Sequence, residues 1–164
     1  MAIFYGGGGR SDEGRIIKVH RGSTTSTSTS SSAITNIFNN TITPAASDSA
    51  FYITFRINMS HTGSNSMYMQ MLINDSVVAS RDDGSDTHGS CSQSWYLTSY
   101  MSSASIQQYV GDHYYTHSGS SAFTFTLRTQ LQGGSSYLNY SYSYNDDERG
   151  YPMSSYTLFE MEPS

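Results

Sequence analysis

The chain has 164 residues, of which 36% are hydrophobic and 13% charged, and its formal net charge is −5. Its eight Lys and Arg residues are scattered, which excludes an extended basic surface for nucleic acid. The single cysteine, Cys91, excludes an intrachain disulfide. No apolar run is long enough to cross a bilayer and the start has no signal-peptide core, so we expect synthesis and folding in a cytoplasm without membrane insertion.

The first thirteen residues differ in character from the rest of the chain. The apolar residues Ile3, Phe4 and Tyr5 precede four consecutive glycines, which do not form the interior of a stable helix or strand. Because these three side chains are costly to leave in water, we interpret residues 1–13 as an attachment arm that packs on a partner. A frayed terminus is the alternative. Residues 14–164 then form one further domain.

The next part of the chain predicts short strands. Residues 14–19 are a strand candidate, and the Ser/Thr run 23–32 is either an edge strand or a linker. A strand over 34–42 should end at Thr43-Pro44, because proline lacks a backbone donor and restricts the residue before it.

Residues 51–59 carry the clearest pattern, Phe-Tyr-Ile-Thr-Phe-Arg-Ile-Asn-Met. Every odd position is large and apolar and every even position is polar, which places the odd set on one face of an extended strand. Such alternation is typical of an antiparallel sheet with one wet face. We therefore expect the odd positions inside, and the outward Tyr52 and Arg56 to face water or a neighbouring subunit.

The middle of the chain predicts a hairpin and a long polar loop. Residues 67–73 form a strand with Met67, Met69, Met71 and Ile73 on one face, and we interpret this methionine stripe as core. A turn at 74–76 leads to a short arm at 77–79. Residues 81–94 form a polar loop, and 95–101 the next strand.

The last third contains further alternating segments. Residues 106–110 form a strand or begin a loop, 111–121 a loop or a short strand, and 123–128 a strand. A turn at 132–136 precedes an alternating strand through Leu138, Tyr140, Tyr142 and Tyr144. Residues 156–161 close the chain, with Phe159 and Met161 inside. Eight to ten strands with turns between them predict an all-β fold, an antiparallel β-sandwich, with a jelly roll as the leading choice.

Signs of chemistry are few. His113 and His117 would share one face if extended, so a metal pair is conceivable, but we interpret them as surface loop histidines. The acidic groups at 82–86 and 146–148 lack the spacing of a dedicated calcium loop, and we expect neither a metal nor a cofactor. There is no Gly-x-Ser-x-Gly elbow and no Cys-x-x-Cys pair, so we do not expect an enzyme.

The order of these features resembles a known group of proteins. Gly14-Arg15-Ile16-Ile17-Lys18-Val19 comes first, then the Ser/Thr run, Thr41-Ile42-Thr43-Pro44 and the alternating strand; the chain closes with Tyr156-Thr157-Leu158-Phe159-Glu160-Met161. In this order the chain is similar to small tail-fibre or appendage proteins of tailed phages, especially those that infect cyanobacteria. The resemblance covers residues 14–162, and Arg15 stands where that group usually has lysine.

The resemblance implies a jelly roll like that of C1q and tumour necrosis factor, assembled as a homotrimer, and a virion component made in the host cytoplasm. Other virion proteins would bind the arm. Polar loops suit adaptable recognition of a host surface receptor or glycan. The candidate receptor-facing loop residues are Asp82, Asp83, His88, Trp95, His113, Tyr114, Tyr115 and His117. Aromatic residues are enriched in interfaces, so Tyr140, Tyr142 and Tyr144 are candidates for the subunit interface.

Two alternative functions stay open on the same fold. One is a capsid decoration or cement protein, in which the arm clamps capsid subunits. The other is a carbohydrate-binding module or lectin, in which Trp95 or a tyrosine stacks on a sugar. A shared fold does not decide between them.

Overall fold

A computed structural model describes residues 14–30, 34–62, 67–79, 96–97, 106–131, 134–140 and 152–162. Within these residues there are strands and no helix, and so no helical segment that could span a membrane. The strands are β1 (Ile16–Thr24), β2 (Ser28–Ser30), β3 (Ile34–Ile42), β4 (Ala50–Thr62), β5 (Met67–Ile73), β6 (Ser76–Ala79), β7 (Tyr96–Leu97), β8 (Gln107–Thr116), β9 (Phe123–Leu131), β10 (Ser135–Leu138) and β11 (Ser154–Met161).

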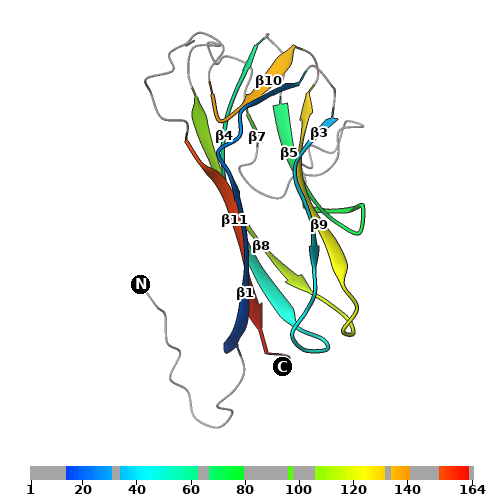
Figure 1. The fold of residues 1–164 in the computed structure, drawn as a ribbon. Coiled ribbons are helices and arrows are strands. Elements are labelled where there is room, and N and C mark those ends of the chain that lie inside the picture. Colours follow the sequence, from blue (N-terminus) through cyan, green and yellow to red (C-terminus); the bar gives the residue numbers. More distant parts are fainter. Residues whose placement is uncertain are drawn as a thin grey trace.

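The strands form two antiparallel sheets that face each other (Figure 1). Sheet A has the order β1-β11-β4-β10-β2, with β8 on the other side of β4. Strands β11 and β10 follow one another along the same edge of β4, at Ala50–Arg56 and Met59–Thr62. Sheet B has the order β3-β9-β5-β6, with β7 also paired to β5. The predicted all-β antiparallel sandwich is confirmed.

The alternating stretch 51–59 lies within β4, in the middle of sheet A. Its odd side chains are buried as predicted, with Phe51, Ile53 and Ile57 wholly inaccessible to solvent. The even positions Tyr52 and Arg56 are exposed. This strand therefore supplies one wall of the core, because its inward set is uniformly large and apolar.

Sheet B supplies the opposite wall. Phe123, Phe125 and Leu127 of β9 are buried, and Met69 and Met71 of β5 are buried beside them. The rings of Phe51 and Phe123 meet edge to face across the sheets, with centroids 5.2 Å apart. This geometry is one that aromatic pairs favour. The predicted core role of the methionine stripe is confirmed for the members whose side chains are described.

Strand β11 departs from the prediction by one position. Its buried residues are Ser154, Tyr156, Leu158 and Glu160, so Phe159 and Met161 face outward and not into the core. The sequence suggested the opposite because Glu160 is charged. In the fold, the Glu160 carboxylate accepts hydrogen bonds from neighbouring chain segments, and these compensate its burial.

Two other segments are defined more closely by the structure. Of the two alternatives predicted for 111–121, a loop or a short strand, the strand is confirmed for 111–116, which continue β8 without a register shift from Gln107 to Thr116. The predicted turn at 132–136 overlaps β10, which ends at Leu138, so Tyr140 lies beyond the strand. Asn139 has a φ of 58° and donates its backbone N–H to the carbonyl oxygen of Asn58, which turns the chain away.

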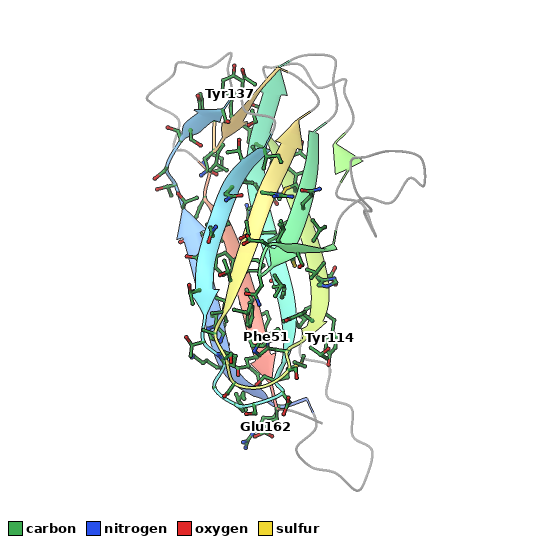
Figure 2. The ribbon with its side chains drawn as sticks, turned by 90° about the vertical axis from the view of Figure 1, so that its right-hand side faces the viewer. Phe51, Tyr114, Tyr137 and Glu162 are labelled. Atoms are coloured by element: carbon green, nitrogen blue, oxygen red, sulfur yellow. The ribbon has the colours of Figure 1, made fainter. Side chains whose placement is uncertain are left out.

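The two ends of the sandwich differ. At one end the start of β1 meets the end of β11, and the N–H of Glu162 donates to the carbonyl oxygen of Arg15. At the other end lies β10, which carries Tyr137 (Figure 2). The segments 63–66 and 132–133 join strand ends there, while the arm 1–13 joins the opposite end. The points at which residues 1–13 and these two segments join the described strands therefore lie at opposite ends of the sandwich.

Candidate functional site

The outer face of sheet A carries a line of apolar side chains across four strands. In antiparallel pairs, residues directly opposite one another share a face. Val19 of β1 pairs with Phe159 of β11, which pairs with Tyr52 of β4, which pairs with Tyr114 of β8. We call these four residues the apolar row.

The apolar row is accessible to solvent. Tyr114 is 58% exposed, Tyr52 40% and Val19 39%, and Phe159 is half-buried between them. Val110, four residues before Tyr114 on the same face of β8, is 63% exposed. Large apolar side chains that gather on one flat face mark an interaction surface more often than scattered ones do.

Tyr52 is held in place within the row. Its ring lies nearly parallel to that of Phe159, with centroids 6.4 Å apart, and its hydroxyl donates to Oδ2 of Asp112 at 3.2 Å. Partial burial and the neighbouring Asp112 carboxylate raise the pKa of Tyr52, so the phenol stays protonated at neutral pH. The row therefore presents neutral aromatic groups in a defined orientation.

A polar line lies next to the apolar row. Arg21 of β1 pairs with Thr157, Thr157 with Thr54, and Thr54 with Asp112 of β8. Arg21 and Asp112 are both exposed and occupy the two edge strands of this face. Three strand spacings, roughly 14 Å, separate them. This line therefore carries a positive charge on β1 and a negative charge on β8, while Arg56 of β4 is also exposed on the same face.

Most of the predicted receptor-facing group at 113–117 lies in a strand, the second of the two alternatives predicted for 111–121. His113, Tyr114 and Tyr115 lie in strand β8 and not in a loop, at the end of the molecule that carries the arm. Tyr114 points outward into the apolar row, while Tyr115 packs between Phe51 and Phe123. The physical reason is continuous pairing with β4, which overrides the turn preference of Gly111-Asp112.

His117 is buried just after β8 and has a structural role. Its Nε2 donates to the carbonyl oxygen of Ser121 at 2.8 Å, its Nδ1 lies 3.4 Å from the Tyr115 hydroxyl, and its ring packs on Phe123.

His113, the other histidine of this segment, lies within β8. Burial is the main influence on its imidazole and lowers the pKa of that group, despite the opposing charge of Asp112. The described residues hold no cluster of three or more His, Cys, Asp or Glu side chains fit for a metal.

The other concentration of polar groups lies at the arm end. Glu160 is wholly buried, yet its Oε1 accepts from the N–H of Ala45 at 2.6 Å and from the Ser49 hydroxyl at 2.8 Å. Its Oε2 lies 2.9 Å from Nε2 of His20. Every bond leads to the protein's own turn or strand, so we interpret this cluster as structural and not catalytic.

The remaining predicted site residues are not brought together within the described chain. The arm residues Ile3, Phe4 and Tyr5 lie outside the described residues, as do Asp82, Asp83, His88 and Trp95 and the interface candidates Tyr142 and Tyr144. Tyr140 is half-buried and its ring packs edge to face on Tyr137 at 5.3 Å. It lies at the end of the sandwich opposite the apolar row.

Sequence reasoning identified only part of the apolar row. Tyr52 was recognisable as the outward residue of an alternating strand, but Val19, Phe159 and Tyr114 were not linked to it. Their grouping depends on cross-strand register, which no local pattern contains.

Comparison of the chain with models of known protein families finds no match, and no curated protein sequence matches it. The face of sheet A therefore has to be interpreted from its own geometry.

Proposed function

We propose that this protein is a structural subunit of a phage virion, a tail-fibre or appendage component, which assembles as a homotrimer through the outer face of sheet A. The observation that carries the assembly part is the apolar row, an ordered line of exposed apolar side chains on a flat sheet. The assignment to a virion rests, in addition, on the resemblance of residues 14–162 to small phage appendage proteins.

The charges beside the row are compatible with a head-to-tail ring. Arg21 lies at the β1 edge and Asp112 at the β8 edge of the same face. In a head-to-tail ring, the β8 side of one copy meets the β1 side of the next, so that these opposite charges approach one another. A closed ring of three copies satisfies both edges of every subunit.

The strand order supports the finer fold within this proposal. The order β1-β11-β4-β8 faces β3-β9-β5-β6, so that strands close in sequence alternate between the sheets. This alternation is what a jelly roll of eight strand positions requires, with β10 and β2 extending sheet A. A jelly roll of this kind leaves one sheet face available for neighbours.

The opposite ends of the sandwich support a division of roles. The arm 1–13 leaves beside Arg15 and Glu162, and segments 63–66 and 132–133 join strands at the far end. A subunit attached to a virion by its arm would present those loops outward, toward the host surface. Host recognition would then belong to the loop end.

The self-association is tested by native mass spectrometry and sedimentation from about 1 to 100 µM. We expect a trimer that dissociates when Tyr52 and Tyr114 are both changed to serine. The matched control changes two exposed apolar residues of sheet B, Ile34 and Val77, to serine, and it should stay trimeric. A monomer at every concentration would refute the assembly part of the proposal.

Charge reversal tests the ring geometry. Arg21→Glu and Asp112→Arg should each weaken the trimer, because each places like charges together across the contact. The double variant should recover most of the affinity. If the loss in free energy of association in the double variant equals the sum of the losses in the two single variants, Arg21 and Asp112 do not meet in the assembly.

The position on the particle is tested by electron microscopy of virions labelled with an antibody against this chain. We expect label at the tail or its appendages. Label distributed over the head would favour the capsid decoration alternative instead.

A further inference from the structure

We infer that, in the unassembled subunit, the N-terminal arm lies across the apolar row of its own chain and shields it until assembly. The inference rests on the proposed function in one respect, because the proposed function assigns the apolar row to self-association. It adds an intramolecular occupant that competes with the neighbouring copy for the same surface.

The arm begins at the right place. It ends at Gly14, next to Arg15, whose carbonyl oxygen accepts from the N–H of Glu162 at the end of β11. Val19, the first member of the row, lies five residues beyond Gly14, or roughly 17 Å along the strand. Tyr5 lies nine positions before Gly14, and nine steps of extended chain can span roughly 30 Å, so the apolar part of the arm can reach the row.

The junction is a glycine with a positive φ. Gly14 has a φ of 85°, a conformation that L-residues with a side chain rarely adopt, and apart from its chain neighbours no described atom lies within 4 Å of where its Cβ would be. The start of β1 is therefore not enclosed by other described residues.

The chemistry of the arm fits the row. In an extended segment Ile3 and Tyr5 point to one side, separated by roughly 6.8 Å. The rings of Phe159 and Tyr52 are 6.4 Å apart along the row. An arm that crosses the strands therefore matches its apolar spacing to that of the rings and buries both sets from water.

Attachment to the same chain makes this contact effective even when it is weak. A short linker gives an effective concentration in the millimolar range, far above the micromolar concentration of a second subunit. If the arm covers the row in about 90% of free subunits, each of the three copies has to release its arm, so half-assembly of the trimer requires about thirty times more protein. The arm becomes available for the virion only when a neighbouring subunit replaces it on the row.

The first experiment compares the full chain with a variant that lacks residues 2–13 by sedimentation. We expect the concentration at half-assembly to fall about thirtyfold in the truncated protein. Serine in place of Ile3, Phe4 and Tyr5 should give the same shift without shortening the chain, and serine at Arg10 should not. An unchanged half-assembly concentration in the truncated protein overturns the inference while the trimer proposal stands.

The second experiment detects the contact directly, in a Cys91→Ser background. Gly6→Cys is combined with Thr54→Cys, which lies beside the row, or with Thr41→Cys, which is exposed on β3 of sheet B. We expect a short bismaleimide to link the first pair within one chain. In a mixture of isotopically labelled and unlabelled protein, each cross-linked product should then join two labelled or two unlabelled peptides, and not one of each. Equal yields for the two pairs overturn the inference. If no form of the protein self-associates, the trimer proposal fails. The arm contact is then tested by the cross-linking yields of the two cysteine pairs alone.

Discussion

His20 Nε2 lies 2.9 Å from Oε2 of Glu160, a carboxylate that is wholly inaccessible to solvent. The contact joins β1 to the inner face of β11, where the opposite carboxylate oxygen receives hydrogen bonds from the turn at 45–49. A single buried charge thus ties two strands and a turn at the arm end of the sandwich. Several donors are needed to compensate such a charge for the loss of water.

The first prediction concerns acid stability. Burial favours the protonated form of Glu160, but the bonds from His20, Ser49, Ala45 and Ala46 outweigh it and hold the pKa below its ordinary value of 4.5. Because the unfolded chain binds the proton more tightly, this carboxylate stabilises the fold fully above pH 4.5. The contribution declines as the pH falls below 4.5 toward the folded pKa.

Urea denaturation between pH 7 and pH 3 measures this effect. Glu160→Gln should be less stable than the wild type at pH 7 and should lose less stability between pH 4.5 and 3. Parallel curves for wild type and Glu160→Gln would contradict the assignment.

The second prediction places a separate transition near neutral pH. Burial lowers the pKa of His113 from 6.5, so the unfolded chain binds this proton more tightly than the folded one does. Stability from the neutral imidazole is therefore complete above pH 6.5 and declines as the pH falls through the folded pKa. His113→Leu should lose less stability than the wild type between pH 7 and 5, as measured by thermal unfolding. A difference confined to pH below 4.5 would argue against this assignment.

The third prediction concerns a close contact between two paired residues. Gly22 of β1 lies opposite Tyr156 of β11, and a Cβ on Gly22 would come within 2.3 Å of the Tyr156 ring. That ring cannot move aside easily, because it is buried against Phe38 and Phe125 with centroids 5.0 Å and 4.9 Å away. We expect Gly22→Ala to cost about 1–3 kcal/mol in free energy of unfolding.

A double-mutant cycle checks the cause of that loss. Gly22→Ala should cost much less in a Tyr156→Leu background, because the shorter side chain no longer covers Gly22. Ser23→Ala, at an exposed neighbouring position, should change stability by less than about 0.5 kcal/mol. If the two changes at positions 22 and 156 are simply additive, the ring is not the cause.

The sequence predicts the strands of this fold correctly where apolar and polar residues alternate without interruption. The β4 segment at 51–59 alternates cleanly, and its predicted buried face is confirmed. The strand predicted at 123–128 lies within β9. Pro44 marks the end of β3 at Ile42 as expected. In these segments the local pattern and the tertiary environment favour the same answer.

Prediction fails where tertiary contacts override local preference. The residues at 111–121 left a loop and a short strand equally open, and it is pairing with β4 that keeps 111–116 extended. Glu160 looks like a surface residue, but buried hydrogen-bond donors stabilise it inside and turn Phe159 outward. The apolar row could not be predicted for a further reason: its four members come from four strands, and only the register brings them together.

The last prediction concerns Asn139, a wholly buried residue with a φ of 58°. Its Nδ2 donates to the carbonyl oxygens of Thr24 and Ser26 at 3.0 and 3.1 Å, and its Oδ1 accepts from the Ser154 hydroxyl at 2.6 Å. The side chain thus links the connection after β1 to the start of β11, at the point where β10 ends. Loss of these bonds leaves several buried polar groups without partners.

Asn139→Gly separates the hydrogen bonds from the backbone conformation, because glycine adopts a positive φ without strain. We expect a loss of about 2–4 kcal/mol in urea denaturation, and roughly 1 kcal/mol more for Asn139→Ala, which adds the strain. Asn74→Gly is the matched control: that residue has a φ of 48° and one side-chain bond, to the N–H of Thr124, but is exposed. It should cost less than about 1 kcal/mol. Equal losses at positions 139 and 74 would show that the buried bonds of Asn139 contribute little, and that the turn conformation alone sets the stability of this junction.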